Sequence, residues 1–298
     1  MTKDAVLAIL RKENDYISGE HISRLLGVSR AAVNTAVKAL RAEGYEISSS
    51  TNKGYHLDAV PNSISAQELA AYLDETRMQT VECLASVDST NNRLRELALA
   101  GAPNGQVVLA NEQTQGKGRR GRAFASPQDN GIYLSILFHP DTLPTDIVEI
   151  TAWTAVATNN AIEEVCGVRA GIKWVNDLVI DRKKICGILT EMSVESESGY
   201  IQYLIIGIGI NVNEQAEDFP EEVRHIATSL AMETGKTHSR AALAAALIRE
   251  LDKMCQAWPK EKTEYLETYR RDNITTGKEI TVVRGTEEAP ALDRKSVV

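Results

Sequence analysis

The sequence has few cysteines and no long apolar run. No stretch approaches the ~18 consecutive apolar residues that a helix needs to span a bilayer. The first residues, Met1 to Asp4, are too polar for a signal peptide. The four cysteines show no C-x-x-C spacing, which argues against zinc sites and disulfide frameworks. We therefore expect a soluble cytoplasmic protein with reduced thiols and no membrane partner.

Common catalytic signatures are missing as well. Residues 116–121 spell G-x-G-x-x-G, but Pro127 and Asn130-Gly131 follow within ten residues, where a dinucleotide-binding fold needs a helix. The G-K-[ST] of a P-loop does not occur, and no Ser-His-Asp or Cys-His pair stands out. These absences exclude the dinucleotide and P-loop interpretations.

The charge is unevenly distributed. The 298-residue chain has a net charge of -8 at pH 7, which argues against a protein that coats nucleic acid over its whole surface. Residues 21–57, however, carry five Lys/Arg against two Asp/Glu. The length and an apolar content of 43% allow two or three domains with a sizeable core. The basic segment indicates a nucleic-acid-binding module at the N-terminus.

The first sixty residues predict a winged helix-turn-helix. Apolar residues at helical spacing predict a helix over residues 3–13. Ser18 and Ser29 are suitable N-caps for a second helix, with Leu25 and Leu26 inward, and for a third helix. Alternating residues on both sides of an Asn-Lys-Gly turn then predict a hairpin, which would be the wing.

The outer face of the third helix is basic, because Arg30, Asn34, Lys38 and Arg41 follow one another at spacings of four, four and three. Asn34 suits adenine, Arg30 suits guanine or phosphate, and the other two suit phosphates. Lys53, at the hairpin tip, is expected to reach the DNA backbone or minor groove. The predicted DNA contacts are Ser29, Arg30, Asn34, Lys38, Arg41 and Lys53. The alternative is a three-helix module whose charged stripe faces water or another protein.

The central part alternates apolar strands with amphipathic helices, which predicts a mixed α/β core. Pro61 and Asn62 mark a linker, after which Ser65 caps a helix. We expect strands over residues 81–87, 106–111, 131–138, 172–180, 185–194 and 203–210, and long helices over 146–165 and 240–258. The polar pair Asn176-Asp177 interrupts the fourth of these strands.

Two polar segments in this core are candidates for ligand binding. The Gly/Arg loop, residues 112–124, holds four cations and three glycines within 116–122. Glycines let the backbone approach a ligand, and Lys and Arg supply donors for an anion. The alternative is a solvated surface loop. Asp88–Asn91 places hydroxyl and amide groups at a helix start, where they serve either as caps or as a site for a neutral polar head or a carboxylate.

Five segments occur in the order seen in biotin protein ligases, and together they resemble that family: Asp88–Asn91, Glu112–Arg122, Lys173–Asp177, Lys184–Leu189 and Gly207–Val212. With the winged helix in front, the chain resembles the bifunctional form, which also represses biotin synthesis and transport genes. The resemblance covers residues 1 to about 280. It implies an α+β multidomain fold with an N-terminal winged helix-turn-helix, a central class II synthetase-like mixed α/β catalytic domain and a C-terminal SH3-like β-barrel.

The resemblance implies a two-step reaction. The carboxylate of biotin attacks the α-phosphate of ATP with the help of Mg²⁺, giving biotinyl-5′-AMP and pyrophosphate. A lysine of a biotin carboxyl carrier protein then attacks this adenylate. Cations must neutralise both anions in the first step. By resemblance, Arg119 holds the intermediate, Lys184 bridges the biotin carboxylate and the phosphate, and Asp177 faces Mg²⁺ or the incoming lysine.

The resemblance assigns further residues to two groups. The biotin and biotinyl-AMP group is Ser89, Thr90, Asn91, Gln113, Gly116, Lys117, Gly118, Arg119, Lys184 and Gly187. The group on the ATP or adenine side is Arg122, Phe124, Asn176 and Asn211. Three positions depart from the family pattern. Lys117 stands where arginine is commoner, Phe124 stands where tryptophan usually packs over the nucleotide, and Val175 replaces a frequent proline.

The resemblance also suggests domain boundaries. We expect a winged helix-turn-helix over residues 1–60, a linker over 61–64, the biotin- and ATP-binding catalytic domain over 65–272, and a partial SH3-like barrel over 273–298. The last segment is too short to close such a barrel, so we expect it to be truncated. The family further implies operator DNA as a partner and a ligand-promoted homodimer, with biotinyl-5′-AMP as corepressor.

Two other functions stay in view. The first is a lipoate-type attachment enzyme on a related core, against which the double-arginine loop and the winged helix argue. The second is a non-catalytic transcription factor that senses a small molecule, against which Arg119 and Lys184 argue.

Overall fold

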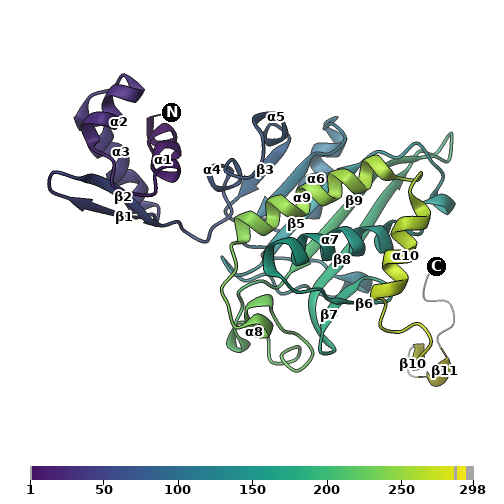
Figure 1. Ribbon diagram of the computed structural model, residues 1–298. Coiled ribbons are helices and arrows are strands. Elements are labelled where there is room, and N and C mark those ends of the chain that lie inside the picture. Colours follow the sequence, from purple (N-terminus) through teal and green to yellow (C-terminus); the bar gives the residue numbers. More distant parts are fainter. Residues whose placement is uncertain (1, 285–286, 293–298) are drawn as a thin grey trace. The chain divides into compact units, whose positions relative to one another are not determined.

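The computed structural model describes residues 2–284 and 287–292, and the chain divides into two compact units, Met1–Asn62 and Ser63–Val298 (Figure 1). The N-terminal unit comprises α1 (Thr2–Lys12), α2 (Gly19–Leu26), α3 (Arg30–Ala42), β1 (Glu46–Ser50) and β2 (Gly54–Ala59). Strands β1 and β2 pair antiparallel, as the predicted wing requires. Asn52 and Gly54 have positive φ in the turn between them, where asparagine and glycine are favoured.

Local capping chemistry explains where α2 and α3 begin. The Ser18 and Ser29 hydroxyls each accept a hydrogen bond from the main-chain N–H three residues on, at 3.1 Å. The core of the unit contains Ile22, and Leu26 packs against it. The predicted inward position of Leu25 is wrong, because its side chain is 59% exposed. Residues four apart share a helix face, and Leu25 falls beside that face.

The second unit is built on a mixed seven-stranded sheet with strand order β3-β4-β5-β9-β8-β7-β6. Strands β3 and β4 are parallel, and every other neighbouring pair in this sheet is antiparallel. The strands are β3 (Val81–Leu84), β4 (Val107–Ala110), β5 (Ile132–Phe138), β6 (Gly171–Lys173), β7 (Asp177–Ile180), β8 (Lys183–Val194) and β9 (Ile201–Ile210).

Helices cover both faces of this sheet. Its helices are α4 (Ala66–Leu69), α5 (Glu75–Met78), α6 (Thr90–Leu99), α7 (Ile150–Cys166), α8 (Leu230–Thr234), α9 (Arg240–Ala257) and α10 (Lys262–Asp272). Helices α7 and α9 lie side by side over the central strands (Figure 1) and close the main core. On the opposite face, Leu94 of α6 joins a smaller cluster with Val108 and Ile205. Within the described residues, no helix has the length and apolar character that crossing a membrane requires.

Two sequence-based element boundaries need correction. The segment 172–180 is a tight hairpin, in which Lys173 of β6 pairs with Asp177 of β7, so the prediction of one interrupted strand is wrong. The turn-prone residues between them reverse the chain. The helix expected over 146–165 begins only at Ile150, because residues 144–146 form a separate 3₁₀ turn that starts with proline.

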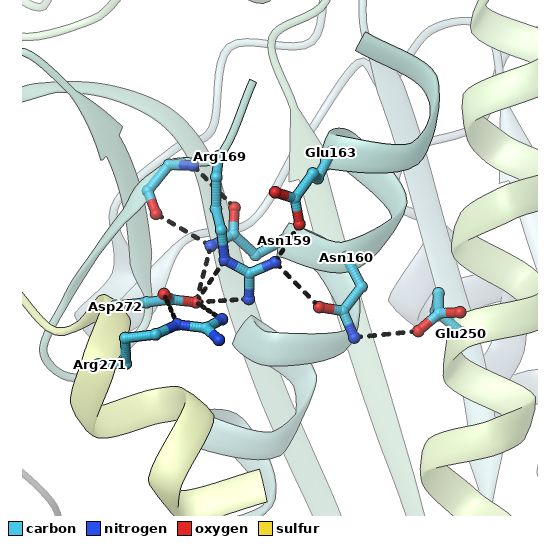
Figure 2. Close-up of polar contacts among 8 residues, drawn as sticks. Asn159, Asn160, Glu163, Arg169, Glu250, Arg271 and Asp272 are labelled. Carbon is cyan, nitrogen blue, oxygen red and sulfur yellow. Dashed lines mark hydrogen bonds and ion pairs between the residues drawn. The ribbon is translucent and has the colours of Figure 1, made fainter. Parts of the chain in front are cut away.

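A polar network anchors α10 to the sheet unit (Figure 2). Arg169 donates to Asp272 at 2.8 and 2.5 Å and to Glu163 at 2.5 Å. Nearby, Asn159 bonds both the N–H and the C=O of Ala170, each at 2.9 Å. These contacts position the end of α10, from which the chain continues into its C-terminal segment.

The predicted barrel segment, residues 273–298, is described only in part. It contains β10 (Glu279–Arg284) and β11 (Glu287–Leu292), which form an antiparallel pair. Residues 285–286 and 293–298 lie outside the described residues. The predicted domain boundaries and the truncated barrel therefore stay predictions.

Candidate active site

Two adjoining pockets lie beside the Gly/Arg loop. The inner one lies against the start of α6 and strands β8 and β9, and the outer one lies against the turn between β6 and β7 and the segment 219–227. The inner pocket is the smaller of the two, and both open to solvent. Five residues are shared by the linings of both pockets: Gly118, Arg119, Phe124, Asn176 and Lys184. Three of these residues are predicted ligand contacts that carry a cation or an aromatic ring. The junction of the two pockets is therefore where a charged reacting group would lie.

The inner pocket contains nearly all of the residues predicted to bind biotin. In addition to the shared residues, it is lined by Ser89, Thr90, Asn91, Gln113, Lys117, Gly187, Ile188, Leu189, Gly207, Ile208 and Gly209. The predicted residue Gly116 does not line it. A Cβ atom on Gly116 would lie 2.3 Å from the Phe124 carbonyl oxygen, so this glycine permits the loop to fold closely on itself.

The polar end of the inner pocket is a network of hydroxyl and amide side chains, backed by the carboxylate of Glu191. Gln113 Oε1 accepts from the main-chain N–H of Thr90 at 2.9 Å and from its hydroxyl at 3.1 Å. Ser135 donates to Asn91 Oδ1 at 2.6 Å, and Asn91 Nδ2 donates to Glu191 at 2.7 Å. These hydrogen bonds fix which side-chain atoms face the pocket. Such a surface suits a ligand head that is polar and uncharged.

Ser89 is the N-cap residue of α6, but its side chain makes no capping hydrogen bond, although it is only 1% exposed. Its hydroxyl is therefore not used to begin the helix. This position favours the ligand-binding interpretation of the segment Asp88–Asn91 over the capping one.

Glycines in β9 give neighbouring groups the room to form the pocket wall. A Cβ atom on Gly207 would lie 2.2 Å from Asn91 Oδ1, and one on Gly209 would lie 2.5 Å from the Phe124 ring. Real Cβ atoms do not approach other atoms so closely. The two glycines therefore let an amide and an aromatic ring lie directly against the strand.

The Gly/Arg loop is folded over the pockets as an irregular hairpin. Phe124 N donates to Gly116 O at 2.9 Å, and Gly118 N donates to Arg122 O at 2.7 Å. At its tip, Arg120 and Gly121 have positive φ, which reverses the chain there. The loop also contacts the turn between β6 and β7, where Arg119 Nη1 donates to Asn176 Oδ1 at 3.3 Å.

Lys184 and Asp177 form an ion pair at the junction, with Nζ and Oδ1 2.7 Å apart. The main chain of Lys184 is fixed on both sides, because its N–H donates to Ile226 O at 2.7 Å and its carbonyl accepts from Thr228 N at 3.0 Å. The ammonium group lies 5.9 Å from the centre of the Phe124 ring. The predicted bridging lysine is thus held where the two pockets meet.

The outer pocket contains the residues predicted for the ATP or adenine side, namely Arg122, Phe124, Asn176 and Asn211, and also Asp177. Its apolar wall is Trp174, Val175, Phe219, Val223, Ile226 and Ala227. Asn211 lines the pocket, but its Nδ2 donates to Lys184 O at 3.2 Å and to Thr228 O at 2.9 Å. Its amide donors therefore position the Lys184 main chain, which the sequence did not predict.

The predicted DNA contacts divide into two kinds. Arg30, Asn34, Lys38 and Lys53 are exposed, as a DNA-contacting surface requires. Ser29 is exposed but caps α3, and Arg41 is exposed but also contacts the wing, so its predicted phosphate contact stays a prediction. Its Nε and Nη2 donate to the Ile47 carbonyl at 2.8 and 2.5 Å. Arg41 therefore ties α3 to the first strand of the wing.

Three residues of the inner network escaped the sequence analysis: Ser126, Ser135 and Glu191. Ser126 accepts from Gln113 Nε2 at 2.9 Å and donates to Phe124 O at 3.1 Å. The other two orient Asn91 from strands β5 and β8. Only Ser135 has a signal in the sequence, as the single polar residue of the apolar strand β5, and that signal is weak.

The fold and the site define a two-unit protein, in which a helix-turn-helix unit is joined to a catalytic-type α/β unit that has two adjoining pockets with cations where they meet. Residues 83–211 match the Biotin/lipoate A/B protein ligase family, and residues 2–56 match an HTH domain. The Bifunctional ligase/repressor BirA of Bacillus subtilis (strain 168) is 40% identical over 242 residues, which is 81% of this chain and 74% of that protein. The chain belongs to the biotin protein ligase family.

Other relatives agree with this assignment. The Bifunctional ligase/repressor BirA of Escherichia coli (strain K12) is 27% identical over 289 residues, covering 97% of this chain and 88% of that protein. Among solved structures, the biotin protein ligase from Aquifex aeolicus in complex with biotin and ATP matches with a TM-score of 0.59 and 27% identity. That match covers 70% of this chain and 84% of the other. The predicted family and the predicted helix-turn-helix and catalytic folds are confirmed.

Proposed function

We propose that the protein activates biotin with ATP, transfers it to a lysine of a biotin carboxyl carrier protein, and represses transcription in response to biotin. The single observation that carries the proposed chemistry is the position of Arg119 and Lys184, which line both pockets at their junction. In the proposal, the inner pocket holds biotin and the outer pocket holds the nucleotide. The carboxylate of biotin then meets the α-phosphate beside these two cations.

The first step joins two anions, so charge neutralisation is its main requirement. A carboxylate oxygen of biotin attacks the α-phosphorus, the bond to the β-phosphate oxygen breaks, and pyrophosphate leaves. Lys184 and Arg119 stabilise the negative charge that gathers on the α-phosphate oxygens in the transition state. In the second step, the carrier amine attacks the acyl carbon, AMP leaves, and the amine loses a proton.

The residues on the outer side fit Mg²⁺ only as a phosphate-bound ion. Among the described residues, no three His, Cys, Asp or Glu side chains converge as metal ligands. Asp177 is the carboxylate at the junction, and it pairs with Lys184. One carboxylate is enough for Mg²⁺, which binds largely through nucleotide phosphates and water. When bound, the ion would neutralise phosphate charge.

The proposed homodimer rests on an open edge of β8. Strand β7 pairs with β8 only over residues 183–187, whereas β9 pairs with it along 186–194. Within the described part of the chain, no strand pairs with the other edge of residues 189–194, where Met192 and Val194 are 48% and 43% exposed. An unpaired edge with apolar side chains favours strand addition from a second copy or from a carrier protein.

One assay tests the enzymatic proposal. The purified protein is incubated with ATP, Mg²⁺, a carrier domain and either biotin or lipoate, and the mass of the carrier is measured. A mass increase with biotin on the acceptor lysine supports the proposal. Modification by lipoate alone would favour the lipoate-type enzyme, and no modification by either would favour a non-catalytic sensor.

A second assay tests the regulatory proposal. DNA binding to the promoter region of biotin genes is measured with biotin and ATP together, and with each alone. We expect tighter binding only when both are present, because biotinyl-5′-AMP would favour the dimer that presents two winged helices. DNA binding that does not change on addition of biotin and ATP would contradict the proposed regulation.

A further inference from the structure

The connection from β4 to β5 carries the Gly/Arg loop between two stems. The first stem is Asn111, directly after β4, and the second stem is residues 129–131, directly before β5. The stems touch each other, since the Asp129 N–H donates to the Asn111 carbonyl at 3.1 Å. Any change in the spacing of the stems would therefore move the whole loop relative to the pockets.

Arg240, the first residue of α9, is buried between these stems with a side chain that is 0% exposed. Its Nε donates to the Gly131 carbonyl at 2.8 Å, its Nη2 donates to Asn111 Oδ1 at 3.0 Å, and its Nη1 lies 3.4 Å from Asp129 Oδ1. A buried guanidinium is tolerated only where hydrogen bonds and opposite charge compensate its lost hydration. Both stems supply that compensation.

Asn111 extends the contact to the start of the catalytic unit. Its Oδ1 also accepts from the Ile64 N–H at 3.0 Å, and its Nδ2 donates to the Ile64 carbonyl at 2.8 Å. Ile64 is 2% exposed and follows the last residue of the N-terminal unit by two positions. One amide oxygen therefore accepts from both Arg240 and Ile64, so a displacement of Asn111 disturbs both contacts.

We propose that Arg240 and Asn111 are positioning residues that hold the stems of the Gly/Arg loop and connect them to the segment entering from the DNA-binding unit. This inference rests on the proposed role of the loop in holding biotinyl-5′-AMP. Fixed stems let the glycine-rich tip close without also ordering its base, so less conformational entropy is lost on ligand binding. The same contacts would carry a change in the loop to Ile64.

Two substitutions at Asn111 separate the two roles. Asn111→Asp keeps an acceptor for Arg240 and for the Ile64 N–H, but it replaces the donor to the Ile64 carbonyl with an oxygen. Asn111→Leu removes every one of these contacts at similar size. Arg77→Met is the matched control, because Arg77 also pairs with α9, through Asp252 at 2.7 Å, and is not among the residues that line either pocket.

Loop position is measured by the rate of trypsin cleavage at the loop cations in the ligand-free full-length protein, at a temperature where circular dichroism shows each variant folded. We expect Asn111→Leu to increase this rate roughly tenfold, and to increase the release rate of the adenylate by a similar factor, because a hydrogen bond to a charged group is lost. Asn111→Asp should keep both rates near those of the unmodified protein. It should weaken the effect of biotin and ATP on DNA binding.

Equal trypsin sensitivity in Asn111→Leu and Arg77→Met would show a general loss of stability and overturn the positioning role. Unchanged DNA regulation in Asn111→Asp would overturn the connection to Ile64. If Asn111→Leu affects stability too strongly, Arg240→Lys provides a second test, since one ammonium group cannot reach all three acceptors. If the unmodified protein does not adenylate biotin, the proposed function fails, while the ligand-free cleavage rates still test the stems.

Discussion

The buried carboxyl group of Glu214 allows a quantitative prediction of how stability depends on pH. Glu214 follows β9, is 1% exposed, and neither carboxylate oxygen has a hydrogen-bond partner of ordinary geometry among the described residues. Its Oε1 lies 2.7 Å from where a Cβ atom on Gly131 would be. Burial raises the pKa of Glu214 from its ordinary value of 4.5 to about 7, against a smaller lowering by nearby main-chain amides and by Arg240.

The sign of the pH dependence follows from this raised pKa. Between pH 4.5 and about 7 the folded state holds a proton that the unfolded state has lost, so stability falls as pH rises through this window. Glutamine has the shape of the protonated acid and does not titrate. Glu214→Gln should therefore raise the free energy of unfolding by about 3 kcal/mol at pH 8 and by only about 1 kcal/mol at pH 5.

The assay is urea unfolding followed by tryptophan fluorescence at both pH values. All three tryptophans, Trp153, Trp174 and Trp258, lie in the unit that contains Glu214, so the signal reports on that unit. Glu217→Gln is the control, since Glu217 is exposed and should show no such difference. A destabilisation by Glu214→Gln that is equal at pH 5 and pH 8 would refute the reasoning, because it would mean that the folded protein uses the charged carboxylate.

Three further predictions concern the site and the DNA-binding unit. Lys184→Met should lower the rate of biotin-dependent ATP–pyrophosphate exchange by roughly 100-fold or more, whereas Lys183→Met, its exposed neighbour, should leave that rate unchanged. Gly209→Ala should raise the KM for ATP or biotin more than Gly187→Ala does. A methyl group at position 209 meets the Phe124 ring, whereas one at position 187 meets the flexible end of Lys184. Equal effects of the two substitutions on KM would contradict this prediction. Lys38→Ala should reduce the slope of DNA affinity against salt concentration by the amount expected for about one phosphate contact. Arg41→Ala should instead lower the free energy of unfolding of the N-terminal unit by about 1–3 kcal/mol, measured by thermal unfolding.

Local sequence signals were sufficient where the structure depends on local chemistry. The helices that begin after Ser18 and Ser29 follow directly from their caps, and the wing follows from a turn sequence that tolerates positive φ. The hairpin of β6 and β7 was missed because its local signal is ambiguous. Two largely apolar segments separated by polar residues fit a strand with an interruption as well as a reversal, and only the pairing of β6 with β7 distinguishes them.

Contacts between residues far apart in the sequence limited how much of the site could be predicted. The spacing of Arg41 on α3 correctly indicated an outer face, but it carried no information about the Ile47 carbonyl that the wing places beside it. Likewise, Ser135 and Glu191 lie 44 and 100 positions from Asn91, and strand pairing brings them together. The charged residues and glycines of the site could be recognised from the sequence, whereas the residues that orient the ligand-facing side chains could not.

The two cations at the pocket junction are held in different ways, and this suits a reaction in two steps. Lys184 lies on a strand, and hydrogen bonds from Thr228 and Asn211 and to Ile226 fix its main chain. Arg119 lies on a glycine-rich loop, and a hydrogen bond of 3.3 Å links it to Asn176. In the proposed reaction, the lysine is thus preorganised for the phosphate in the first step. The arginine would follow the ligand as the loop closes, and would leave when the carrier lysine must reach the acyl carbon.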